Sequence, residues 1–107
     1  MEMLQISICA RDDKRFELLR TCQLIVDQTL QESGCESSLI SQKKADEGLI
    51  NLEQKWDNKS SLNNYFRSDQ FTALLGAMKW LGRSYDIRLN GGTHEEGIEI
   101  VKSARRA

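Results

Sequence analysis

The stretch that decides the fold is LINLEQKW at residues 49–56, followed by DN at residues 57–58. Apolar and polar side chains alternate along it: the first face carries Ile50, Leu52, Gln54 and Trp56, and the second carries Asn51, Glu53 and Lys55. This period of two residues predicts a strand with one buried face. The aspartate–asparagine pair that follows predicts the cap of a helix.

Working outward, the same period predicts three more strands, at residues 3–9, 36–42 and 85–90, with a hairpin connection at residues 43–48. Helical periods predict a helix at residues 14–32, a helical region at 59–83 that breaks at Ser68, and a C-terminal helix at about residues 93–105. The order β-α-β-β-α-β predicts an α+β, ferredoxin-like fold, with one antiparallel sheet and two helices on one of its faces. We expect residues 1–107 to form a single domain, with a core at about residues 3–90.

Several local signals refine this prediction. The apolar stripe of the first helix is expected to contain Phe16, Leu19, Cys22, Val26 and Leu30, widened by Leu18 and Ile25. Gly34 is expected in the left-handed conformation that ends a helix, and Ser68 is expected to cap a new one. Thr93 and Glu96 form a capping box, and Trp80 is expected to pack in the core.

Composition excludes several classes of function. The net charge is -1, from 15 basic and 16 acidic residues, so the basic excess of a nucleic-acid-binding protein is absent. The sequence contains no basic amphipathic segment of the kind that binds a membrane surface. No apolar run approaches the roughly 20 residues of a transmembrane helix. The 3 cysteines lack CxxC spacing and the first 15 residues do not resemble a signal peptide, so we expect reduced thiols in the cytoplasm.

The second face of the predicted sheet has no helix to cover it. It carries polar side chains: Gln5, Ser7, Asn51, Glu53, Lys55 and Arg88. A face of this polarity is stable in water, so the physical argument alone is compatible with a monomer.

Four residues carry a resemblance to a known family. A strand ends in Trp56, a leucine follows at Leu62, and Ser68 and Phe71 open the second half of the helix; residues 32–35, ESGC, close the first helix with an acidic-x-Gly-Cys turn. In this pattern the chain resembles the antibiotic biosynthesis monooxygenase (ABM) family over residues 3–90. The resemblance implies a dimeric α+β barrel, in which the sheets of a homodimer pack face to face. Pairs across that interface would involve Asn51, Glu53, Lys55 and Arg88, with a contribution from the C-terminal helix.

The resemblance also implies a reaction. The family's best-known enzymes oxidise phenolic or anthrone-like molecules with molecular oxygen, without a metal or another cofactor. By this resemblance the catalytic candidates are Trp56 as a wall of the cavity, Tyr65 as a polar handle and Gln54 as a hydrogen-bond donor. The candidates for binding a small-molecule substrate are Asn63, Asn64, Phe66 and Phe71. The cavity is expected between the sheet and the helices.

Departures from the family pattern favour other interpretations. Gln54 replaces a common glutamate, and Tyr65 and Gln70 replace histidines. Leu75 stands where haem-degrading relatives carry an iron ligand, and leucine cannot ligate iron. A non-catalytic binding or sensing module is therefore the alternative, and isomerisation of an enol is a third candidate. An open cavity of mixed polarity, lined by Trp56 and Tyr65, favours chemistry. A cavity filled by Phe66, Phe71 and Met78 favours binding at a surface, or no ligand at all. The only histidine, His94, is expected to be a solvated cap residue.

Overall fold

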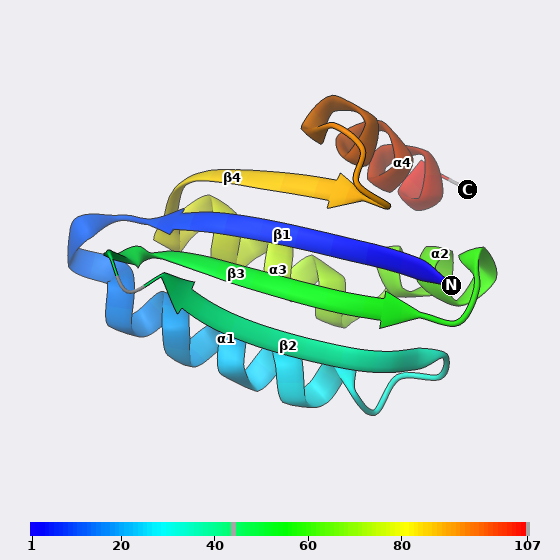
Figure 1. Cartoon of the computed structure of the whole chain (residues 1–107), viewed down its shortest axis with the longest axis horizontal. Coiled ribbons are helices and arrows are strands. Elements are labelled where there is room, and N and C mark those ends of the chain that lie inside the picture. The colour runs from blue at the N-terminus through cyan, green and yellow to red at the C-terminus, as the bar shows by residue number, and fades with distance from the viewer. Residues whose placement is uncertain (44, 107) are drawn as a thin grey trace.

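The computed structural model describes residues 1–43 and 45–106, and the side chain of Glu47 is not part of the description. The elements are β1 (Glu2–Ala10), the short helix η1 (Asp12–Lys14), α1 (Arg15–Thr29), β2 (Cys35–Lys43), β3 (Asp46–Trp56), α2 (Lys59–Phe66), α3 (Asp69–Leu81), β4 (Gly82–Leu89) and α4 (His94–Arg106). Figure 1 shows α1 and α3 behind the same face of the sheet, with α4 beside β4.

The sheet has four antiparallel strands in the order β2-β3-β1-β4, which confirms the ferredoxin-like α+β fold. The strands are longer than the alternation predicts: β3 begins at Asp46, which pairs with Lys43, and β4 begins at Gly82, which pairs with Ala10. Of the expected connection at residues 43–48, Lys44 lies outside the described residues. Both β3 and β4 begin earlier than predicted, because backbone pairing with the neighbouring strand starts before the alternation of apolar and polar side chains does.

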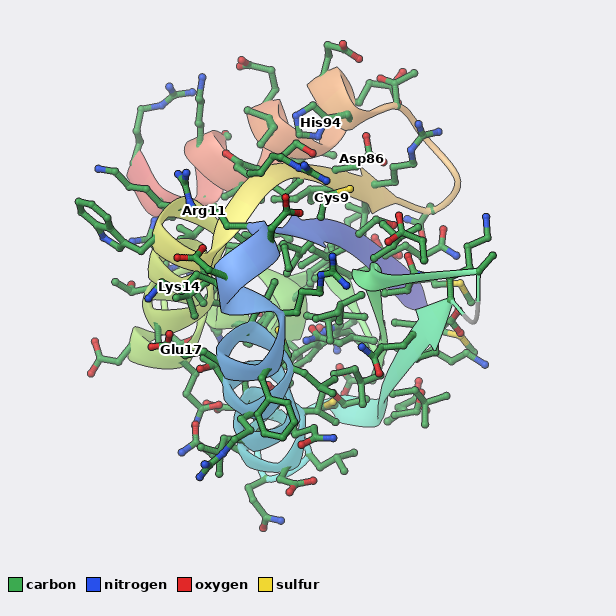
Figure 2. The ribbon with its side chains drawn as sticks, turned by 90° about the vertical axis from the view of Figure 1, so that its left-hand side faces the viewer. Cys9, Arg11, Lys14, Glu17, Asp86 and His94 are labelled. Carbon is green, nitrogen blue, oxygen red and sulfur yellow. The ribbon has the colours of Figure 1, made fainter. Side chains whose placement is uncertain are left out.

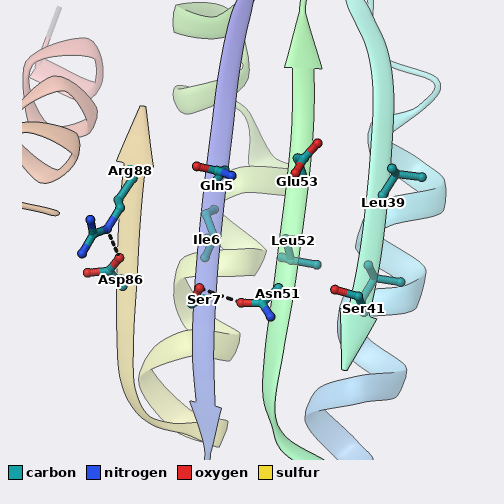
Figure 3. A pocket seen from close by; sticks show the side chains of 11 residues that line it. Gln5, Ile6, Ser7, Leu39, Ser41, Asn51, Leu52, Glu53, Asp86 and Arg88 are labelled. Atoms are coloured by element: carbon teal, nitrogen blue, oxygen red, sulfur yellow. Dashed lines mark hydrogen bonds and ion pairs between the residues drawn. The ribbon is translucent and has the colours of Figure 1, made fainter. Parts of the chain in front are cut away.

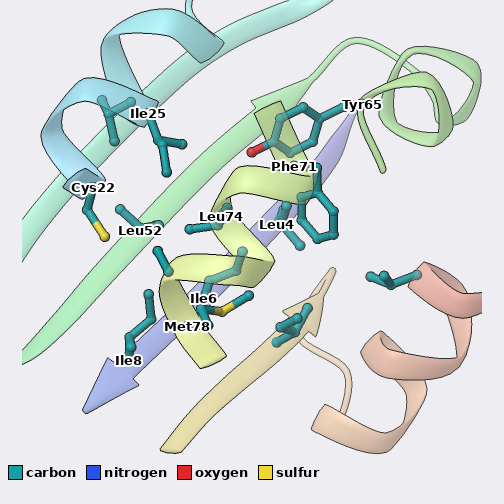
Figure 4. Close-up of a cluster of buried hydrophobic side chains, with 14 of the residues drawn as sticks. Leu4, Ile6, Ile8, Cys22, Ile25, Leu52, Tyr65, Phe71, Leu74 and Met78 are labelled. Atoms are coloured by element: carbon teal, nitrogen blue, oxygen red, sulfur yellow. The ribbon is translucent and has the colours of Figure 1, made fainter. Parts of the chain in front are cut away.

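The core lies between the sheet and the helices (Figure 4). In α1 the buried stripe is Leu18, Cys22, Ile25, Val26 and Thr29. The prediction that Phe16 belongs to this stripe was wrong, because Phe16 is 79% exposed. Two residues of helix turn through about 200°, so Phe16 and Leu18 point in nearly opposite directions. The expectation for Leu30 was also wrong, because it follows the last residue of the helix and is exposed.

Trp80 does not pack in the core, contrary to expectation. It is 69% exposed, near the end of α3, with the Lys79 ammonium 5.3 Å from its ring centroid. The buried face of α3 is formed instead by Phe71, Leu74, Ala77 and Met78. Trp80 lies two residues beyond Met78, which again places it on the opposite side of the helix.

The predicted caps at the starts of α2, α3 and α4 are confirmed. The side chains of Asn58 and Ser68 accept hydrogen bonds from the amides of Ser61 and Phe71, which open α2 and α3. Thr93 caps α4 through the Glu96 amide, at 3.2 Å. Gly34 has the expected left-handed φ of 89°, but the prediction that it ends the first helix was wrong, because α1 ends at Thr29 and Gly34 lies in the turn before β2.

His94 has a structural role that the sequence did not indicate. Its Nδ1 accepts a hydrogen bond from the Ile87 amide of β4 at 2.9 Å and lies 3.8 Å from a carboxylate oxygen of Asp86. Figure 2 shows His94 and Asp86 together on the side of the molecule formed by β4 and α4. The prediction of a merely solvated cap residue was therefore wrong, because the ring joins α4 to the sheet.

No helix of the described residues is long and apolar enough to cross a membrane.

Candidate functional site

The alternation of β3 turns Gln54 and Trp56 toward the helices, as predicted. Tyr65 projects from α2 into the same space, together with Leu62 and Phe66, because positions three and four apart share one helix face. Gln54 and Trp56 are 0% exposed and Tyr65 is 2% exposed. The three candidate catalytic side chains therefore lie together inside the protein.

A chain of hydrogen bonds joins these three side chains. The Trp56 Nε1–H donates to Oε1 of Gln54 at 3.2 Å, and the Gln54 amide nitrogen donates to the Tyr65 hydroxyl oxygen at 3.1 Å. The rings of Trp56 and Tyr65 are stacked, with their centroids 4.7 Å apart and an interplanar angle of 28°. Gln54 is thus fixed at both ends of its amide by an aromatic side chain.

The other buried polar side chains gather around this chain. In the described part of the molecule the buried polar and charged residues are Glu2, Thr29, Ser38 and Gln54. The strand register places Ser38 opposite Gln54 and Glu2 opposite Trp56. The Thr29 hydroxyl donates to the Ile25 carbonyl at 2.6 Å and is close enough to the Tyr65 hydroxyl to influence its pKa. We call these six residues, Glu2, Thr29, Ser38, Gln54, Trp56 and Tyr65, the polar cluster.

The polar cluster is unusual for the interior in which it lies. Burying a polar group costs free energy unless a hydrogen bond replaces its contact with water. The Ser38 hydroxyl is buried and has no hydrogen-bond partner in the structure. An unsatisfied hydroxyl beside a buried amide and a buried phenol is typical of a place where a further polar group binds.

Burial also sets the protonation of the cluster. It raises the pKa of the Tyr65 hydroxyl, an effect partly offset by the hydrogen bond from Gln54 and by the nearby Thr29 hydroxyl. Tyr65 is therefore a neutral phenol at pH 7, able to donate a hydrogen bond. Burial also raises the pKa of the neighbouring Cys35 thiol, and the negative charges of Glu32 and Glu36 raise it further. Neither group is prepared to act as an anion at neutral pH.

The cluster is closed in this structure. Phe71 packs edge-on against both Tyr65 and Phe66, with ring centroids 5.2 Å and 5.0 Å apart, and both phenylalanines are at most 1% exposed. The predicted apolar lining thus lies beside the catalytic candidates. Asn63 lies elsewhere, in a surface groove, and Asn64 is exposed and accepts a hydrogen bond from Arg67 at 2.8 Å.

The groove that contains Asn63 lies between α2 and α4, over the start of β1. We call it the α2–α4 groove; it has a volume of about 350 Å³ and is lined by Glu2, Lys59, Leu62, Asn63, Arg67, Leu89, Ile100, Ser103 and Ala104. Figure 1 shows the start of β1, the end of β3 and α2 at the same end of the sheet. Glu2 belongs to both the groove and the polar cluster, and Leu62 lies between them.

A second groove, of about 540 Å³, follows the face of the sheet that no helix covers (Figure 3). Its polar side chains bond to each other: Arg88 pairs with Asp86 at 2.6 Å, and the Ser7 hydroxyl donates to Asn51 at 2.7 Å. Glu53 also lines this groove. Among the described residues, no three His, Cys, Asp or Glu side chains come together as a metal site.

Three members of the polar cluster were not predicted. Glu2 has the same parity as Leu4 and Ile6, so extending the first strand by one residue toward the N-terminus would have placed it on the buried face. Thr29 falls on the correct helical stripe once Leu18 replaces Phe16 as its start. The position of Ser38 depends on how β2 pairs with β3, which the sequence of β2 does not specify.

Fold and site together define a ferredoxin-like protein with a closed polar cluster between its sheet and its helices. A sequence profile of the antibiotic biosynthesis monooxygenase family matches residues 1–76, so the chain belongs to that family. No curated protein matches the chain.

Solved structures agree with the fold. A Deinococcus radiodurans protein named for this family is 22% identical, with a TM-score of 0.79 over 86% of this chain and 92% of that one. A Pseudomonas aeruginosa protein is 19% identical, with a TM-score of 0.75 over 82% of this chain and 89% of that one. A conserved Methanosarcina mazei protein is also 19% identical, with a TM-score of 0.75 over 82% and 88%. At these identities the likeness establishes the fold alone.

Proposed function

We propose that the protein is a cofactor-independent monooxygenase that acts on a small aromatic, quinol-type substrate at the polar cluster. The observation that carries the proposal is the hydrogen-bonded chain Trp56–Gln54–Tyr65, buried in an otherwise apolar core. Membership of the family and the name of the Deinococcus radiodurans relative support the same type of reaction.

The proposed chemistry uses the electrons of the substrate. Loss of a proton to solvent water gives an electron-rich anion, which transfers one electron to molecular oxygen and then forms a carbon–oxygen bond with the reduced oxygen. For an anthrone-like CH₂ group, one oxygen atom remains in the new carbonyl and the other leaves as water with the two hydrogens. The O–H of Tyr65 and the second N–H of Gln54 would stabilise the negative charge of the substrate anion, because both donors are held in a site of low dielectric.

The proposal requires the cluster to open, and α2 is the element that would move. It has only 8 residues, too few to be stable without tertiary contacts. Its end is held to α4 by two hydrogen bonds, from Arg105 to the Phe66 carbonyl at 2.6 Å and from Arg67 to the Ala104 carbonyl at 3.3 Å. Release of these bonds would expose Tyr65 and then Trp56.

Oxygen uptake tests the proposal. Metal-stripped protein is supplied with hydroquinones and anthrones, and the uncatalysed oxidation is subtracted. We expect Trp56→Phe and Tyr65→Phe to lower kcat/KM about tenfold or more, since each removes one hydrogen bond of the buried chain. Trp80→Phe is the matched control, because it makes the same substitution at an exposed position. Uptake equal to the uncatalysed rate, or equal losses in the control, would contradict the proposal.

A second candidate function is a non-catalytic small-molecule binding or sensing module on the same scaffold. The closed packing around Trp56 favours it, because a filled interior leaves binding to the surface grooves. Saturable binding of an aromatic ligand without oxygen uptake would distinguish this candidate from the oxygenase.

We also propose that the chain forms a homodimer through the uncovered face of its sheet. Glu53 and Lys55 on this face pair with no charged partner in the described part of the molecule, and Arg88 pairs only with Asp86 of its own strand. Two copies packed face to face would bring Lys55 or Arg88 against Glu53. Light scattering at micromolar concentration should give the mass of two chains; the mass of one chain would refute the dimer.

A further inference from the structure

We propose that the α2–α4 groove binds a small aromatic compound with a hydroxyl group at one end and an anionic group at the other, and that Glu2 accepts the hydrogen bond of that hydroxyl. This compound would be the substrate of the proposed monooxygenase, and the presence of its hydroxyl group is inferred from that proposed function. Binding itself is measured separately from oxygen uptake.

Glu2 is the first reason. It is 9% exposed and is the one buried carboxylate in the described part of the chain. Its hydrogen-bond partner is neutral and distant: Nδ2 of Asn90 donates to Oε1 of Glu2 at 3.3 Å. No ion pair to Glu2 is formed by the described residues, although buried carboxylates are normally paired. The second carboxylate oxygen is therefore available to a donor in the groove.

The cations of the groove are the second reason. Lys59 and Arg67 both line it. Arg67 is held by neutral acceptors, the Ala104 carbonyl and the Asn64 side chain, and in the part of the chain that the structure describes neither cation pairs with a carboxylate. The groove thus offers a carboxylate from β1 and two uncompensated cations from α2 and its end. A ligand with a donor at one end and an anion at the other matches this arrangement.

The walls of the groove are the third reason. Beside its charged and polar side chains the groove has apolar ones, Leu62, Leu89, Ile100 and Ala104, and Ile100 is a large apolar side chain left exposed. Apolar walls with a few polar groups at the ends are typical of small-molecule sites, and about 350 Å³ is within their usual size. Apolar walls favour an aromatic ring over a sugar, whose hydroxyl groups need polar partners when they are buried.

The position of Glu2 joins the groove to the polar cluster. Glu2 pairs with Trp56 across β1 and β3, and both side chains project to the helix side of the sheet. A hydroxyl bonded to Glu2 therefore lies one strand away from Trp56, whose ring is stacked on Tyr65 of α2. The groove would be the position a substrate occupies before α2 moves.

The test uses a probe that oxygen does not consume. It is a hydroxynaphthoate with its hydroxyl and carboxylate at opposite ends, compared with the naphthoate that lacks the hydroxyl. Calorimetry measures both affinities at pH 7 for the wild-type protein and Glu2→Gln, which keeps the size of the side chain. We expect the hydroxyl to increase affinity about tenfold in the wild type and less than about twofold in Glu2→Gln. Glu17→Gln, on the exposed face of α1, is the matched control and should behave as the wild type.

Two further measurements keep the inference open to refutation if Glu2→Gln does not fold. Ile100→Trp fills the groove from an exposed position and should abolish binding of both probes. Lys59→Gln should weaken binding of both probes by up to about fivefold, because each carries the carboxylate. A hydroxyl contribution that is equal in the wild type and Glu2→Gln, absence of binding, or ligand-induced amide shifts at Ser7 and Asn51 in place of Asn63 would overturn the inference.

Discussion

The hydrogen bonds of Gln54 predict a measurable coupling between Gln54 and Tyr65. Tyr65→Phe removes one hydroxyl and leaves the Gln54 amide nitrogen without its 3.1 Å acceptor, at a site that is 0% exposed. A buried donor without a partner costs about 1–3 kcal/mol. Gln54→Leu removes the acceptor of the Trp56 N–H and the donor to the Tyr65 hydroxyl, two hydrogen bonds of the buried chain, so we expect a loss of about 2–4 kcal/mol.

The double variant gives the decisive quantity. With both partners removed, only the Trp56 N–H remains unpaired, so the double variant should be about 1–2 kcal/mol more stable than the sum of the single losses predicts. Equilibrium urea unfolding at pH 7, followed by circular dichroism at fixed protein concentration, measures all four proteins. The exposed pair Lys14 and Glu17, 3.4 Å apart, is the control and should show a coupling of only about 0.2–0.5 kcal/mol. Equal couplings in the two pairs would refute the reasoning that Gln54 links the polar cluster.

Three other perturbations test neighbouring parts of the structure. Burial raises the pKa of Cys22 from 9.0 to about 11, so the native protein keeps a proton that the unfolded chain loses; between pH 9 and 11 this group should lower the unfolding free energy by about 2 kcal/mol, and in urea titrations the fall should be smaller by that amount in Cys22→Ala. Gly34→Ala should cost about 1–3 kcal/mol in thermal unfolding, because a Cβ at a φ of 89° would collide with Ser61, whereas Gly76→Ala, where a Cβ meets nothing, should not. Arg105→Met removes the bond to the Phe66 carbonyl, so hydrogen exchange of the α2 amides should accelerate about tenfold or more while that of the β1 amides stays unchanged; unchanged rates in α2 would show that Arg105 does not hold the helix.

The sequence predicts the fold because its local signals agree with one another. Alternation in residues 49–56 fixes which side chains of β3 point inward, and the caps at Asn58, Ser68 and Thr93 fix where three helices begin. These features depend on neighbours a few residues apart, which are visible in one sequence. Gln54 and Trp56 could be placed on the buried face for the same reason.

The errors arise where the outcome depends on distant parts of the chain. Phe16 and Leu18 are both apolar, and only the packing of α1 on the sheet decides which of them is buried. Trp80 was expected inside because large aromatic residues usually are, yet α3 already presents Phe71, Leu74 and Met78 to the core. The polar cluster has the same origin: Ser38 and Glu2 reach Gln54 and Trp56 only through strand register.

The energetics of the polar cluster support the proposal that it is a binding site. A core with leucine at Gln54, alanine at Ser38 and phenylalanine at Tyr65 would avoid the cost of burying an amide and two hydroxyls, and would keep the same shape. The remaining core achieves such apolar packing over the rest of the sheet. Polar side chains persist instead at one end, beneath the shortest α-helix and beside the groove that Glu2 lines. Stability alone does not account for that concentration, whereas a small polar molecule admitted by movement of α2 accounts for the hydroxyl of Ser38, the amide of Gln54 and the carboxylate of Glu2 together.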